Sequence, residues 1–73
     1  MSSEASLEIN GELRRYPDGK PPATVMQLLR ELDVDPARIV AEVNGEVVSR
    51  RDFEARALAD GDTVELVRFV GGG

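Results

Sequence analysis

The sequence predicts an α+β fold, in which a mixed sheet of four to five strands packs one face against a single main helix. Two Asn-Gly pairs, each between short runs with alternating polarity, indicate tight hairpins. One segment in the first half of the chain has the spacing of a helix with one apolar stripe, and such a stripe must be buried against another layer.

The N-terminal part of the chain predicts a β-hairpin. Leu7-Glu8-Ile9 alternates in polarity, and Asn10-Gly11 favours the positive φ angles of a two-residue turn. Residues 12–16 then form the returning strand. Residues 17–22 contain three prolines and a glycine, which predicts a loop, because proline cannot donate a hydrogen bond to a strand ladder.

The helix is predicted to begin at Thr24. Thr24 and Gln27 have the spacing of a capping box, in which each side chain satisfies the other residue's backbone amide. The apolar stripe follows at i, i+3, i+4 and i+7, in Val25, Leu28, Leu29 and Leu32. Pro36 disfavours helical geometry at the residue before it, so the helix should end within residues 33–36 after two to three turns.

The second half of the chain predicts three more strands. Residues 39–43 and 46–48 flank the turn Asn44-Gly45. Residues 49–58 are ambiguous, with Phe53 and Leu58 expected to anchor them to the core. After a turn at residues 60–62, the last strand should turn Val64 and Leu66 to one face and Val67 and Phe69 to the other.

This β-β-α-β-β-β order predicts the β-grasp, or ubiquitin-like, fold, although other small α+β folds share the order. In a β-grasp the first and last strands pair in parallel at the sheet centre, and the helix lies in the crossover between them. We expect one domain over residues 1–70 and a flexible glycine tail over residues 71–73.

Composition excludes several classes of function. The chain has 73 residues and a formal net charge of -5, which argues against nucleic-acid binding and favours a partner with a basic surface. It contains no Cys and no His, so disulfides, metal sites built on Cys or His, and Cys or His catalysis are excluded. Because no membrane span or signal peptide is recognisable, we expect a cytoplasmic protein.

The sequence ends in Gly71-Gly72-Gly73, directly after the last predicted strand. Three extended residues reach about 10 Å, and glycine has no side chain to block a narrow passage. The tail therefore suits insertion into another protein's active site. A frayed end or a cloning remnant is the alternative interpretation.

Several motifs together resemble the ThiS family, the ubiquitin-like sulfur carriers of thiamin biosynthesis. The resemblance is carried by residues 43–48, Arg50, Phe53, Leu58, residues 60–67 and residues 70–73, and the helix lies where that family has one. It covers nearly the whole chain. Ser49 departs from the family, many of whose members have proline at this turn, but it does not affect the chemistry.

The resemblance implies that the α-carboxylate of Gly73 is the reactive group. An adenylyltransferase of the ThiF type, related to ubiquitin-activating enzymes, would use ATP to join this carboxylate to AMP. A persulfide on another protein would then displace AMP and leave a thiocarboxylate, and a ThiG-type thiazole synthase would receive the sulfur. The carrier would be a protein cosubstrate that binds no cofactor or metal itself, with no catalytic side chain of its own.

Docking would need a surface as well, and Val67 and Phe69 are the predicted partner-binding residues, because the face they occupy is open in this fold. Three alternatives remain open at this point. The chain could be the small subunit of molybdopterin synthase or another pathway's sulfur carrier, a protein modifier that forms isopeptide bonds, or a plain interaction module.

Overall fold

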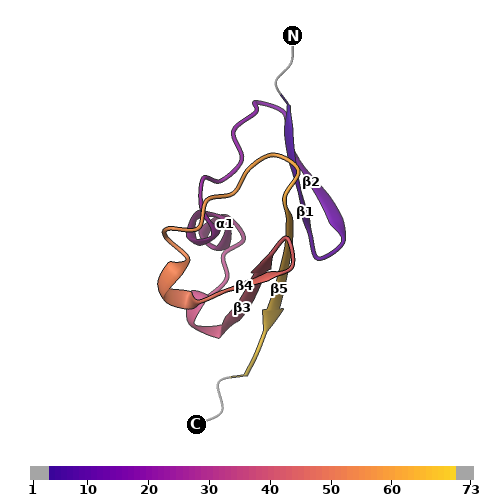
Figure 1. The fold of residues 1–73 in the computed structure, drawn as a ribbon. Helices are drawn as coiled ribbons and strands as arrows, with labels where there is room; N and C mark the ends of the chain where they lie inside the picture. The colour runs from indigo at the N-terminus through magenta and orange to yellow at the C-terminus, as the bar shows by residue number, and fades with distance from the viewer. Residues whose placement is uncertain (1–3, 71–73) are drawn as a thin grey trace.

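The computed structural model describes residues 4–70, which form a five-stranded sheet with one α-helix on one face (Figure 1). The strands are β1 (Ala5–Ile9), β2 (Glu12–Tyr16), β3 (Ile39–Val43), β4 (Glu46–Val48) and β5 (Thr63–Arg68). Their spatial order is β2-β1-β5-β3-β4, with β1 and β5 parallel and all other neighbours antiparallel. The helix α1 (Val25–Glu31) lies in the crossover between β2 and β3. The predicted β-grasp arrangement is confirmed.

Both predicted Asn-Gly hairpins are present. Asn10 and Gly11 have φ angles of 51° and 81°, and Asn44 and Gly45 have φ angles of 52° and 85°. Two consecutive left-handed residues define the turn whose twist matches that of the flanking strands, and asparagine tolerates this conformation better than most residues. The turns therefore set the registers of β1–β2 and β3–β4.

The start of α1 agrees with the prediction in part. The Thr24 hydroxyl accepts a hydrogen bond from the Gln27 amide at 3.2 Å, as a helix cap should. The Gln27 side chain, however, accepts from the Ala23 amide at 2.9 Å and not from the amide of Thr24. The chain entering the helix is extended, and Thr24 forms an antiparallel bridge with Ala57, so the reciprocal bond is shifted by one residue.

The prediction that Pro36 ends the helix is wrong. The helix ends at Glu31, because Asp33 adopts a left-handed φ of 57°. The amide of Asp33 then donates to the carbonyl of Arg30, and the amide of Val34 donates to that of Leu29, at 3.2 and 3.1 Å. Pro36 instead opens the 3-10 helix η1 (Pro36–Arg38).

The core lies between α1 and the sheet, and no polar side chain of the described residues is buried in it. Its largest fully buried side chain is Phe53, which follows the 3-10 helix η2 (Arg50–Asp52). The carbonyl of Phe53 also accepts a hydrogen bond from the Met26 amide at 2.9 Å. Phe53 and Leu58 thus anchor residues 49–58 to the helix side of the sheet, as predicted.

The opposite face of the sheet has no covering layer among the described residues (Figure 1). No helix in this part of the chain is long and apolar enough to cross a membrane. Residues 71–73, where the glycine tail was predicted, lie outside the described residues.

Candidate functional site

The last described residues leave the sheet from the end of β5. Arg68 is the last residue of β5 and pairs with Ile39, the first of β3. The Phe69 amide still donates to the Arg38 carbonyl at 2.9 Å. The backbone is therefore paired with β3 up to Arg68, and Phe69 holds it to Arg38, the last residue of the 3-10 helix η1, close to the predicted tail.

The first Asn-Gly turn supports β5 through a side chain. β1 pairs with β5 only at Glu8–Thr63 and Ile9–Val64, so β1 provides no backbone partner for β5 beyond that point. The Asn10 side-chain oxygen accepts the amide hydrogen of Leu66 at 2.7 Å. Asn10 therefore satisfies a strand amide that the short parallel ladder does not reach.

The second Asn-Gly turn supports the beginning of the same strand. The Asn44 side-chain oxygen accepts from the Thr63 amide at 2.9 Å, and its side-chain nitrogen donates to Asp62 at 3.0 Å. The other carboxylate oxygen of Asp62 accepts from the Ala59 amide at 2.9 Å. Sequence reasoning treated both asparagines as turn residues only and missed that their side chains fix β5.

Asp60 connects the turn before β5 to β1. One of its carboxylate oxygens accepts from the Ser6 amide, and the Gly61 amide donates to the Ser6 carbonyl, both at 2.8 Å. Asp60, Gly61 and Asp62 are motif residues of the resemblance noted above, and in the structure they secure the strand that leads to the glycines.

The predicted partner residues are exposed. Val67 is 57% and Phe69 43% exposed, and Val67 lies on the uncovered side of the sheet. Two further valines that the sequence analysis did not select occupy the same side, since Val40 lies opposite Val67 in the ladder and Val47 opposite Glu42. We call this surface the open face; its exposed apolar residues on the strands include Val40, Val47 and Val67.

The position of Val40 on the open face could have been recognised from the sequence. In the segment 39–43 the residues that alternate with the buried ones are Val40 and Glu42. An apolar residue at an outward position of a strand next to β5 extends the patch that Val67 begins. Finding it requires knowing that β3 lies beside β5, which follows from the β-grasp order.

Three polar side chains connect the edge strand β2 to α1: Arg14 and Tyr16 of β2, and Glu31 of α1. The same carboxylate oxygen of Glu31 accepts from Arg14 at 2.8 Å and from the Tyr16 hydroxyl at 2.7 Å. Burial first, and then the hydrogen bond to Glu31, raise the pKa of Tyr16 to about 12. Glu31 of α1 thus accepts two hydrogen bonds from β2, which gives the cluster a structural role.

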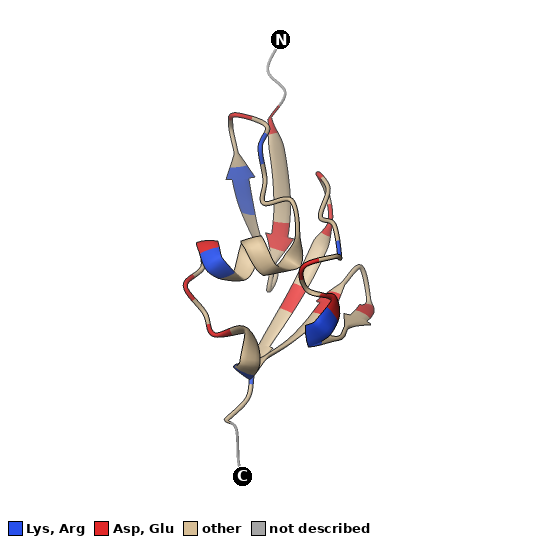
Figure 2. Ribbon diagram, turned by 90° about the vertical axis from the view of Figure 1, so that its left-hand side faces the viewer, with Lys and Arg blue, Asp and Glu red and all other residues tan. Residues whose placement is uncertain are grey.

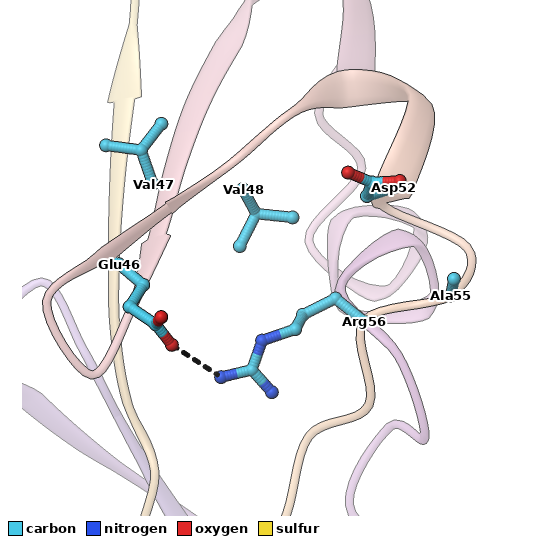
Figure 3. Close-up of a pocket in the computed structure, with 6 residues that line it drawn as sticks. All are labelled: Glu46, Val47, Val48, Asp52, Ala55 and Arg56. Atoms are coloured by element: carbon cyan, nitrogen blue, oxygen red, sulfur yellow. Dashed lines mark ion pairs between the residues drawn. The ribbon is translucent and has the colours of Figure 1, made fainter.

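A shallow cavity of about 300 Å³ lies beside β4 (Figure 3). Its lining residues are Glu46, Val47, Val48, Asp52, Ala55 and Arg56. Figure 3 shows Glu46 and Arg56 directed toward one another, and their charged atoms lie 4.0 Å apart. The two charged groups thus pair with each other across the cavity.

Comparison with known proteins identifies the family. The model of the ThiS family matches residues 7–73. The sulfur carrier protein ThiS of Bacillus subtilis is 30% identical over 67 residues, which cover 92% of this chain and 98% of that protein. A solved structure of the thiamine biosynthesis protein ThiS of Geobacter metallireducens matches with a TM-score of 0.77 and 39% identity, covering 93% of this chain and 99% of that one.

A longer relative contains a similar segment. The thiazole synthase of Paramagnetospirillum magneticum is 42% identical over 67 residues, which are 92% of this chain but only 20% of that protein. This chain therefore spans about a fifth of the length of that relative. Taken with the full-length similarity to small ThiS proteins and the five-stranded fold, the family match leads to one conclusion: the chain belongs to the ThiS family, the family of the Bacillus sulfur carrier protein.

Proposed function

We propose that this chain carries sulfur for thiazole formation in thiamin biosynthesis, as a thiocarboxylate on Gly73. The observation that carries the proposal is the family match, which continues through Gly73 itself. The hydrogen bond from Phe69 to Arg38 adds support, because it holds the backbone beyond the end of β5, close to the glycines.

The chemistry begins with activation of a poor electrophile. The negative charge of a carboxylate is delocalised, so its carbon resists attack by a nucleophile. A ThiF-type adenylyltransferase joins the Gly73 carboxylate to the α-phosphate of ATP, and pyrophosphate leaves. The product is an acyl-adenylate, in which AMP is a good leaving group.

Sulfur then replaces AMP. The terminal sulfur of a protein persulfide attacks the acyl carbon, a carbon–sulfur bond forms and the bond to AMP breaks. A thiol next cleaves the sulfur–sulfur bond, which leaves the thiocarboxylate on the carrier and a disulfide on the donor side. Thiazole synthase accepts this sulfur, and the similarity of the chain to a segment of a thiazole synthase supports that partner.

The glycines have a physical role in this scheme. Each partner enzyme must keep water away from a reactive acyl group, which favours a narrow channel around the tail. A side chain at Gly72 would need a wider channel. Because the carrier contains no Cys, it holds reactive sulfur without a thiol that could exchange with it.

The test is reconstitution with the adenylyltransferase, ATP and a persulfide donor, followed by intact-mass measurement. The expected result is exchange of one oxygen for sulfur at the C-terminus, located by fragmentation to Gly73. A chain with Gly73 deleted is the control and should remain unmodified. An unmodified wild-type chain in the presence of an active adenylyltransferase would refute the proposal, and conjugates to lysines of other proteins would indicate a modifier instead.

A further inference from the structure

The two Asn-Gly turns have almost the same sequence but different surroundings. Ile9-Asn10-Gly11-Glu12 and Val43-Asn44-Gly45-Glu46 each place a β-branched residue before the pair and a glutamate after it. Both asparagines are exposed, and their φ angles are 51° and 52°. A difference in the chemistry of the two turns must therefore come from the contacts of the asparagine side chains.

An asparagine followed by glycine can lose its side-chain amide without an enzyme. The backbone nitrogen of the glycine attacks the side-chain carbonyl carbon of the asparagine, and ammonia leaves from that carbon with the proton of the attacking nitrogen. The product is a cyclic imide, which water opens to aspartate or to isoaspartate. Glycine favours this reaction because it has no side chain to hinder the attacking nitrogen.

The attacking nitrogens are alike in the two turns. Within residues 4–70, neither the Gly11 nor the Gly45 amide donates a hydrogen bond to a backbone carbonyl. Both glycines are exposed, and a Cβ on either of them would meet no atom within 4 Å. Each turn must open locally before the ring can close, because the left-handed turn fixes the backbone of its asparagine.

The asparagine side chains are held unequally. Asn10 makes one side-chain hydrogen bond among the described residues, from the Leu66 amide at 2.7 Å. Asn44 makes two, since its oxygen accepts from Thr63 at 2.9 Å and its nitrogen donates to Asp62 at 3.0 Å. The nitrogen of Asn44 is the atom that must leave as ammonia, so the bond to Asp62 restrains the leaving group. Deamidation of Asn44 thus has to break one more hydrogen bond than deamidation of Asn10.

We propose that Asn10 is a site of spontaneous deamidation in the folded protein, and that Asn44 is protected by its hydrogen bond to Asp62. The reaction consumes one water molecule and releases one ammonia at each converted site. This inference is independent of the proposed function, because it needs no partner protein and does not involve the glycine tail.

The surroundings of Asn10 also accommodate the product. An aspartate at position 10 keeps an oxygen for the Leu66 amide, and the added charge strengthens that hydrogen bond. Arg14 lines a cavity of about 330 Å³ together with Asn10, and Arg68 lines another of about 290 Å³ with it. Figure 2 shows positive residues on β2, beside the first turn, while acidic residues occur along the central strands. A new negative charge at position 10 therefore lies near arginines.

The same conversion at position 44 would disturb the fold. A carboxylate oxygen would replace the nitrogen that lies 3.0 Å from Asp62, and two carboxylates at this distance repel each other. Isoaspartate would disturb either turn, because it adds a methylene group to the backbone of a turn that sets the register of its hairpin. At Asn10, the aspartate product thus retains the bond to β5, whereas the isoaspartate product weakens it.

The test is peptide mapping by mass spectrometry after incubation of the folded protein at mildly alkaline pH. Fragmentation assigns each exchange of an amide for a carboxyl group to one of the two turns, and electron-transfer fragmentation separates aspartate from isoaspartate. The same incubation in urea gives the reference ratio of the two rates, which should be near one because the flanking residues are of the same kind. Folding should change this ratio about fivefold in favour of Asn10, the effect of one hydrogen bond.

Asp62→Ala tests the protection directly. It removes the partner of the Asn44 nitrogen, so the rate at Asn44 should approach the rate at Asn10 in the same molecule. Thr24→Ala is the control, because it removes the cap of α1 and lowers stability without removing a contact of either turn. It should leave the ratio of the two rates as in the wild type. Thermal melts establish that both variants are folded at the temperature of incubation.

Three results would overturn the proposal. A ratio of rates that is the same in the folded protein as in urea would show that the side-chain hydrogen bonds do not matter. Reaction of both sites in urea but of neither in the folded protein would show that the turn alone protects Asn10. A folded Asp62→Ala variant with the wild-type ratio would show that Asp62 does not protect Asn44.

Discussion

Replacing Asn44 by alanine should destabilise the protein by about 3 kcal/mol. The substitution removes the hydrogen bonds to Asp62 and Thr63, at 3.0 and 2.9 Å, each worth about 1 kcal/mol. It also puts alanine at a φ of 52°, a left-handed conformation that asparagine tolerates better than alanine does, which adds about 1 kcal/mol. Asparagine at this position therefore contributes through both its side chain and its backbone conformation.

Two related variants separate these contributions. Asn44→Gly keeps the left-handed turn but loses both hydrogen bonds, so it should cost about 2 kcal/mol. Asn10 has nearly the same φ, 51°, but its side chain makes one hydrogen bond to β5. Asn10→Ala should therefore cost about 2 kcal/mol, less than Asn44→Ala.

The assay is urea unfolding followed by circular dichroism, with thermal melts as a second measurement. A domain of 73 residues is expected to have a total stability of about 4 to 11 kcal/mol, so a loss of about 3 kcal/mol is large. The melting temperature of Asn44→Ala should fall by about 12 to 24 °C. A loss below about 1 kcal/mol, or an Asn10→Ala variant that is less stable than Asn44→Ala, would refute this account of β5.

Three further predictions concern the glycine tail, the open face and the hydrogen bond of Tyr16 to Glu31 of α1. Gly72→Val should leave the melting temperature unchanged but abolish adenylation; normal conversion by intact mass would exclude a narrow channel. Val67→Asp should weaken binding to the adenylyltransferase at least about tenfold with little effect on stability, because the side chain is 57% exposed; unchanged calorimetric affinity would contradict the assignment. The pKa of Tyr16 is 10.0 without the fold and about 12 in the folded protein, so the unfolded chain releases this proton at lower pH. The free energy of unfolding should therefore fall by roughly 1 kcal/mol as the pH rises from 10 to 12. In thermal melts across that range, Tyr16→Phe should show a smaller decline than wild type, and identical curves would rule the effect out.

Much of the fold could be predicted because its signals are local. An Asn-Gly pair between alternating segments defines a hairpin wherever it occurs, and the apolar stripe of α1 indicates one buried face. The end of the helix could not be predicted in the same way. The proline rule places it near Pro36, whereas the left-handed conformation of Asp33 ends it earlier, and aspartate does not signal that conformation as strongly as glycine does.

The candidate site could be predicted to a smaller extent, because its parts come together only in the folded sheet. The exposure of Val67 followed from alternation along one strand and is confirmed; Phe69 is exposed as well, but β5 ends one residue before it, at Arg68. The contribution of Val40 depends on its register opposite Val67. The bonds from Asn10 and Asn44 to β5 join residues far apart in the sequence, so no local pattern reveals them. The assignment of Gly73 remains a prediction, since it lies outside the described residues.

The hydrogen bonds that hold β5 and the docking of a partner on the open face should both influence adenylation of the C-terminus. A partner that docks on the open face contacts the outward side of β5, and the backbone runs from there toward the glycines. The direction in which the chain leaves the sheet depends on how firmly β5 is held, by the side chains of Asn10 and Asn44 and by the bond from Phe69 to Arg38. Loosening β5 should therefore reduce the rate of adenylation even at saturating carrier concentration, because the docked complex would present its terminus correctly only part of the time. Asn10→Ala, measured well below its melting temperature, should lower kcat more than it raises KM, whereas Val67→Asp should do the opposite.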